Sequence, residues 1–133
     1  MAVDYGDART GIAVSDDSAS LVGEAWVVHE KSQAAVVSEI VAQAASRSVR
    51  IIVVGFPKNM NGTVGPRAEK SEQLAKLLRS ECEIEVVLWD ERLTTMSAHR
   101  ILTDTGRYGD KRKKTIDAVA ASLILESYLR FMG

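Results

Sequence analysis

The chain has 133 residues, of which 46% are hydrophobic and 26% charged, so we expect residues 1–133 to form one domain with its own core. Its 17 Lys and Arg are balanced by 18 Asp and Glu, and the formal charge of −1 excludes attraction of a nucleic acid through overall charge. The single cysteine, far in sequence from both histidines, excludes a disulfide framework and a zinc site. No apolar stretch approaches the roughly 20 residues that span a bilayer. The first residues do not resemble a signal peptide, so we expect a cytoplasmic protein without membrane contact.

Short strands are predicted in the first part of the chain. One runs into Asp4, and Thr10 to Ser15 and Ala25 to His29 form two more, separated by polar turns. Strands this close together predict an antiparallel meander. Gln33 to Arg47 then has apolar residues at helical spacing, which predicts a helix packed on the sheet.

Strands and helices alternate in the middle of the chain. Ile51 to Val54 is a β-branched apolar run, typical of a buried parallel strand, and Gly55-Phe56-Pro57 is expected to end it. A helix from Pro66 to about Arg79 and a strand from Ile84 to Trp89 follow a polar loop.

Two helices are expected to close the chain. Thr94 or Thr95 can cap one that reaches about Thr103, and Thr115 can cap the last. The element order predicts an α/β fold, a mixed five-stranded sheet with helices packed on it. Trp26 and Trp89 lie inside strand patterns and are predicted to be core residues, as is Phe56.

Four carboxylates lie where predicted elements begin or end. Asp4 closes the first strand, Asp90 and Glu91 close the last strand, and Asp117 is predicted in the first turn of the final helix. Sites in open α/β sheets collect at the carboxyl ends of parallel strands, so we expect these acids to converge. Carboxylates brought together need a cation, and their oxygens suit Mg²⁺ or Mn²⁺. A pair of such ions is typical of phosphodiester hydrolysis.

Each acid also has a structural interpretation. The helix dipole alone favours an Asp in a first helical turn, which would account for Asp117. The sequence Asp90-Glu91-Arg92 is typical of an exposed turn with a surface ion pair. Asp4 is harder to explain in this way, because it interrupts an apolar strand where Val or Ile would pack better.

Basic residues near these acids are candidate contacts for phosphates. The guanidinium of Arg9 follows a glycine turn, Lys58 and Arg67 flank a loop that leads into a helix, and a basic segment precedes Asp117. Tight turns and solvated loops are the structural alternatives. The predicted nucleic-acid contacts are Arg9, Lys58, Arg67, Arg107, Lys111, Arg112, Lys113 and Lys114.

Four motifs in order resemble the YqgF family, also called RuvX or Holliday junction resolvases. They are VDYGDARTGIAVSD at 3–16, VVGFPKNMNGTVGPRA at 53–68, VVLWDERLTT at 86–95 and KRKKTIDAVAASLILESYL at 111–129. The resemblance implies a ribonuclease H-like fold, carboxylate-bound Mg²⁺ or Mn²⁺, and endonuclease activity on the 5′ end of the small-subunit ribosomal RNA precursor. It also implies that Asp4, an acid of the Asp90-Glu91 pair and Asp117 bind the metal.

Adjacent strand residues point to opposite faces, so one of Asp90 and Glu91 is expected to face the metal, and Glu91 is favoured as the catalytic partner of Asp4 and Asp117. Only three residues precede Asp4, fewer than in most relatives, which predicts weak pairing of a short first strand.

Several alternatives remain open from the sequence. The substrate is structured RNA or branched DNA, because backbone contacts dominate the recognition of both. A non-cutting RNA-binding assembly factor fits the same motifs. An actin-like ATPase shares the opening strand but needs a second domain. The chain is a monomer or a homodimer, and the latter would suit the cutting of a four-way junction.

Overall fold

The computed structural model of the chain describes residues 1–16, 21–91 and 109–132, and for residues 109–117 it describes the backbone alone. The strands in these ranges are β1 (Ala2–Asp4), β2 (Thr10–Ser15), β3 (Val22–Val28), β4 (Ile51–Phe56) and β5 (Glu85–Asp90). The helices are α1 (Gln33–Ser46), α2 (Pro66–Glu81) and α4 (Gly109–Met132).

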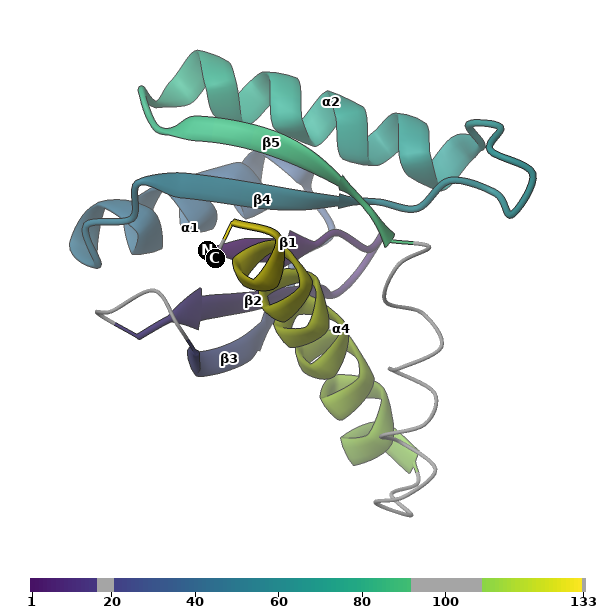
Figure 1. Cartoon of the computed structure of the whole chain (residues 1–133), viewed down its shortest axis with the longest axis horizontal. Helices are drawn as coiled ribbons and strands as arrows, with labels where there is room; N and C mark the ends of the chain where they lie inside the picture. Colours follow the sequence, from purple (N-terminus) through teal and green to yellow (C-terminus); the bar gives the residue numbers. More distant parts are fainter. Residues whose placement is uncertain (17–20, 92–108, 133) are drawn as a thin grey trace.

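The strands form one mixed sheet in the order β3-β2-β1-β4-β5. The first three are antiparallel neighbours, which confirms the predicted meander, whereas β1, β4 and β5 run parallel to one another. Their last residues, Asp4, Phe56 and Asp90, therefore end at the same edge of the sheet, which we call the carboxyl edge (Figure 1).

Each face of the sheet has its own core. On one face, Val3, Ile52 and Val54 pack with residues of α1 and α2 such as Ile40 and Leu74. On the other face, the alternate strand residues Ala2, Ala13 and Val53 pack against Ala121, Ile124 and Leu125 of α4. Within residues 1–16, 21–91 and 109–132, α1 and α2 therefore cover one side of the sheet and the long helix α4 covers the other (Figure 1). None of the described helices has an apolar stretch long enough to cross a membrane.

Strand β4 extends further than predicted. It continues through Gly55 and Phe56, which pair in register with Trp89 and Asp90 of β5, so the expected end at Val54 is wrong. Pairing with β5 keeps these residues in the sheet. A glycine inside a strand can mark a close approach by other groups and need not end the strand.

Helix α4 begins earlier than predicted. It starts at Gly109, so Thr115 is not its cap, Asp117 is not in its first turn, and Lys111 to Lys114 are helical and not a loop. Lys and Arg are good helix formers, which explains why the basic segment joins the helix. The helix predicted near Thr94 lies outside the described residues.

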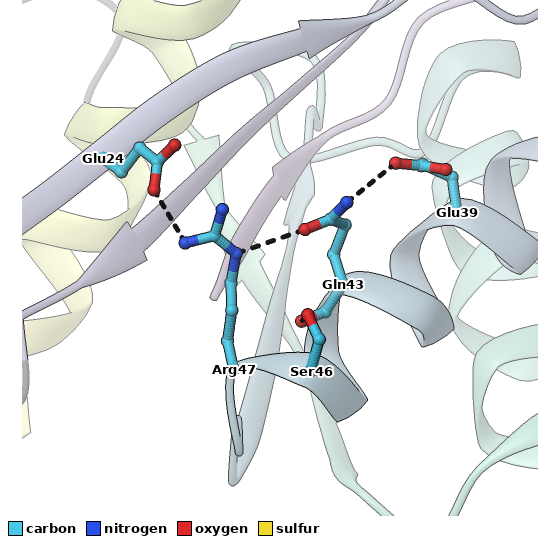
Figure 2. Close-up of polar contacts among 5 residues, drawn as sticks. All are labelled: Glu24, Glu39, Gln43, Ser46 and Arg47. Carbon is cyan, nitrogen blue, oxygen red and sulfur yellow. Dashed lines mark hydrogen bonds and ion pairs between the residues drawn. The ribbon is translucent and has the colours of Figure 1, made fainter.

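A polar cluster fastens the end of α1 to the edge strand β3 (Figure 2). The Arg47 guanidinium donates to Oε2 of Glu24 at 2.7 Å and to Oε1 of Gln43 at 3.2 Å, and it lies over the Trp26 ring at 4.6 Å from the centroid. Trp26 is half-buried against the core, as predicted, and Arg47 covers its outer side. At the other end of α1, the Ser32 hydroxyl accepts from the Ala35 N–H and caps the helix.

Candidate active site

Asp4 lies at the carboxyl edge in the middle of the sheet. It is the last residue of β1, pairs with Gly11 of β2, and is only 9% exposed. Although β1 has three residues, both of its neighbours, β2 and β4, pair with it. The predicted weakness of the first strand is therefore wrong, because a central strand is held from both sides.

Glu91 reaches Asp4 from two strands away. It follows β5, and its side chain forms a hydrogen bond with Asp4 of β1 although β4 lies between these strands. Gly55 of β4 permits this crossing, because a Cβ there would lie 2.9 Å from Cδ and 3.0 Å from Cγ of Glu91. The same Cβ would lie 2.7 Å from Cδ1 of Ile124 on α4. Gly55 is thus the point where Glu91 and α4 both contact β4.

The charge state of Glu91 is set by opposing effects. Burial, the largest effect, raises the pKa of Glu91 above its usual range. The hydrogen bond with Asp4 and the positive charge of Arg67 act in the opposite direction, and the negative charge of Asp90 adds to the rise. A hydrogen bond between two carboxyl groups needs a proton on one of them, so the pair forms a site for one proton or for a cation.

Asp90 belongs to the other face of the sheet. Side chains of β5 alternate, and Leu88 packs in the core with α1 and α2, whereas Val87 and Trp89 pack on the α4 side. Asp90 continues the series of Leu88, while Glu91 continues that of Trp89 and contacts Asp4. The alternation therefore separates the two acids.

The direction of α4 indicates where the backbone of Asp117 lies. The C-terminal part of this helix, with Tyr128 and Met132, lines a hollow of about 680 Å³ together with Met1 and Ile51, at the edge where β1 and β4 begin. Ile124 contacts Gly55 near the end of β4, so α4 runs toward the carboxyl edge as it is followed back to its N-terminus. Position 117 lies seven residues before Ile124, on the same helix face and about 10 Å further along. Its side chain is outside the described residues.

The described side chains supply only part of the predicted metal site. Among the residues whose side chains are described, no group of three or more His, Cys, Asp and Glu is arranged to hold a metal ion. The structure brings together Asp4 and Glu91, and Asp90 acts on this pair through its charge, from the other face of β5. Their carboxylate oxygens suit Mg²⁺ or Mn²⁺ better than a metal that prefers nitrogen or sulfur ligands.

One of the predicted cations, Arg67, lies near the acid pair. Arg67, in the first turn of α2, is close enough for its charge to lower the pKa of Glu91. Lys58 follows β4, and its ammonium lies over the Phe56 ring at 5.6 Å from the centroid. Arg107 lies outside the described residues, and the side chains of Lys111, Arg112, Lys113 and Lys114 are likewise not described.

The glycine turn before Arg9 has a structural explanation. A Cβ on Gly6 would lie 2.4 Å from the carbonyl oxygen of Arg9, so the turn itself fills the space that a side chain would need. The loop is also tied to α2, because Lys70 donates to Oδ1 of Asp7 at 2.7 Å. This exposed pair lowers the pKa of Asp7, through the hydrogen bond from Lys70 first and its charge second.

Sequence reasoning missed three features of this region. Gly55 was interpreted as a strand end, and the contact between Ile124 and Gly55 and the pair of Asp7 with Lys70 were not anticipated. A glycine within a β-branched run is a signal for close approach and could have identified Gly55. The other two join segments distant in sequence, and no local pattern marks them.

The sequence matches known proteins over nearly its whole length. The family model described as "RuvX: Holliday junction resolvase" matches residues 1–131. A relative from Geobacillus sp. (strain WCH70), named "Putative pre-16S rRNA nuclease", is 46% identical and aligned over 97% of this chain and 95% of its own length. A relative of the same name from Clostridium novyi (strain NT) is 40% identical, over 97% and 96%.

One solved structure has a similar fold. Thermus thermophilus RuvC superposes with a TM-score of 0.56 and 11% sequence identity, covering 98% of this chain and 94% of the other. The mixed sheet with its helices is therefore of the ribonuclease H type, as the sequence motifs implied.

Gly55→Ala tests the crossing point. The added methyl group collides with Glu91 and Ile124, and we expect a loss of about 1–3 kcal/mol in the free energy of unfolding, as is typical of overpacking. Ile124→Val removes the Cδ1 that collides, so the double variant should lose less than the sum of the single losses in urea unfolding. Ile40→Val, in the core on the other face, should be additive with Gly55→Ala. Additivity in both pairs would contradict the assignment.

Glu91→Gln tests the buried carboxyl group. Because burial raises the pKa of Glu91, the unfolded chain releases this proton at lower pH than the folded protein does. The stability that depends on the proton is present below the ordinary carboxyl pKa and is lost as the pH rises through the folded pKa. Gln stays neutral and can still bond to Asp4, so in EDTA the variant should be the more stable protein at neutral pH and equal to wild type in acid.

Urea unfolding across this pH range is the measurement. Glu83→Gln, which changes an exposed carboxylate between α2 and β5, is the matched control and should follow the wild-type pH profile. A Glu91→Gln protein that is no more stable than wild type at neutral pH would show that the carboxyl group carries no burial penalty.

Proposed function

This chain belongs to the RuvX family, and from that premise we propose that it is a metal-dependent endonuclease that hydrolyses phosphodiester bonds in ribosomal precursor RNA. The proposal treats residues 1–133 as one cytoplasmic nuclease domain. Two relatives are named as pre-16S rRNA nucleases, which supports hydrolysis of RNA phosphodiester bonds. The ribonuclease H-like fold is compatible with this reaction.

The hydrogen-bonded contact of Asp4 with Glu91 carries the proposal. Two carboxyl groups from non-neighbouring strands meet at the carboxyl edge, where α/β folds place their sites. Burying both without a cation is unfavourable, and the fold nevertheless keeps β4 free of a side chain at Gly55 so that they can meet. We propose that both are metal ligands and that Asp117, on the stretch of α4 that runs toward this edge, is the third.

Mg²⁺ or Mn²⁺ bound there, as a pair of ions, would activate water and neutralise the leaving oxyanion. Asp4, Glu91 and Asp117 are the proposed catalytic acids. Asp90, on the other face of β5, would influence the site through its charge and is a weaker candidate ligand.

The basic residues are proposed to hold the phosphate backbone. Arg67 acts on the charge of Glu91, Lys58 follows the end of β4, and Arg9 ends the turn after Asp4. The basic segment of α4 precedes Asp117 on the same helix, so its cations would extend the contact along the strand. Such contacts position the substrate without reading its sequence.

Branched DNA is the second candidate substrate, and the description of the matching family supports it. Cleavage of a ribosomal precursor RNA and of a synthetic four-way junction, side by side with Mg²⁺ or Mn²⁺, distinguishes the two. We expect cleavage of the RNA at its 5′ side and loss of all cleavage in EDTA. Binding of RNA without cleavage in any metal would favour a non-cutting assembly factor, and preferred cleavage of the junction would favour the resolvase. Sedimentation would show whether the active species is a monomer or a homodimer.

Asp4→Asn and Asp117→Asn test the metal ligands. Each removes a charge and keeps the side-chain shape, so the fold should survive while Mg²⁺-dependent cutting falls by about 10³-fold or more. Cleavage rates and circular dichroism check the two parts of this expectation. Glu24→Gln, in an exposed pair on β3, is the control and should cut at the wild-type rate. Undiminished cutting by both Asn variants would refute the assignment.

A further inference from the structure

The loop between β4 and α2 presents an exposed apolar residue beside the candidate active site. Met60 at its tip is 88% exposed and Val64 is 45% exposed. Both ends of the loop are anchored near the acids, since Phe56 pairs with Asp90 at one end and Arg67 acts on the charge of Glu91 at the other. A substrate that occupies the site must therefore pass close to this loop.

Internal hydrogen bonds hold the loop in shape. The Asn59 N–H donates to the Thr63 carbonyl at 2.9 Å, and the Gly62 N–H donates to the Asn59 carbonyl at 2.8 Å. The side chains of Asn59 and Thr63 are bonded at 2.9 Å, and the Thr63 hydroxyl donates to Oδ1 of Asn61 at 2.7 Å. Gly62 has a φ of 86°, a conformation that favours glycine. This network makes Met60 the projecting corner of a preformed turn, which lowers the entropic cost of using it in a contact.

The charge around the tip indicates the partner. From Pro57 to Arg67 the chain has two cations, Lys58 and Arg67, and no acid. An apolar tip between cations fits a nucleic acid, whose phosphates pair with the cations and whose bases accept the apolar side chain. Methionine is one of the residues that proteins insert between base steps, and its flexible thioether adapts to the stacked rings.

We propose that Met60 inserts against a nucleobase of the substrate and unstacks one base step next to the cleavage site. This inference rests on the proposed nuclease function and adds a preference for a strand whose bases are accessible, such as the junction between a stem and a single-stranded extension. Lys58 and Arg67 hold the phosphates on either side of that step.

The probe is an RNA stem with a single-stranded 5′ extension that carries 2-aminopurine at successive positions, with Ca²⁺ replacing Mg²⁺. Wild type should raise the fluorescence at one base step near the stem junction. Met60→Ala should lose this signal and weaken binding about fivefold to tenfold, at the lower end of what base contacts contribute. Met60→Phe should keep both, and Met132→Ala, an exposed methionine at the far end of α4, should behave as wild type.

Salt dependence separates base contact from phosphate contact. Met60→Ala should leave the slope of log affinity against log salt unchanged. Lys58→Ala should reduce the magnitude of this slope by about 1, as expected for the loss of one phosphate contact. Unchanged RNA affinity and fluorescence in Met60→Ala would overturn the proposal. So would a weaker binding that accompanies a change in the sedimenting mass of the protein, because Met60 would then contact another copy of the chain. Failure of wild type to cut RNA in Mg²⁺ or Mn²⁺ refutes the nuclease function instead, since the fluorescence signal needs no cleavage.

Discussion

The arrangement of this protein depends on one close approach, at Gly55. Parallel strands lie about 4.8 Å apart, so β1 and β5 are separated by nearly twice that distance with β4 between them. An acid on β5 can meet an acid on β1 only if its side chain is long and the residue that it crosses is small. Glu91, Gly55 and Asp4 satisfy both requirements, and α4 seats Ile124 on the same glycine. The residue that permits the contact of the two acids is thus also part of the packing of the long helix.

In this arrangement the requirements of stability and of function conflict. The Asp4-Glu91 pair is buried, and burial raises the pKa of Glu91, so ionisation of the pair weakens the fold as the pH rises. The two apolar layers offset the penalty, with Ile40, Leu74 and Ile52 fully buried on one face and Ile124 on the other. A cation bound by the pair would convert this penalty into binding energy, and by linkage it would stabilise the folded chain.

The sequence predicts the sheet well because period and composition are local properties. The β-branched run at 51–54 and the alternation after residue 84 identify β4 and β5, and the same alternation separates Glu91 from Asp90. The start of α4 could not be predicted in this way, because a threonine followed by apolar spacing resembles a cap although Lys111 to Lys114 already favour helix. The role of Gly55 also escapes local reasoning, since it depends on side chains that arrive from β5 and from α4.

Although the charges of the whole chain nearly cancel, acids and cations have separate roles at the carboxyl edge. The pair of acids alone would repel a phosphate, so the substrate must be attracted by neighbours. Arg67 can act on the acids and on a phosphate. Its charge lowers the pKa of Glu91, and it lies at the end of a loop that contains Lys58 and no acid. On the proposed function, the cations bring a phosphate to the acids and the acids bring a metal to the phosphate, so each would bind more tightly in the presence of the other. A formal charge of −1 is compatible with this coupling, because the charges that matter lie within one edge of the sheet.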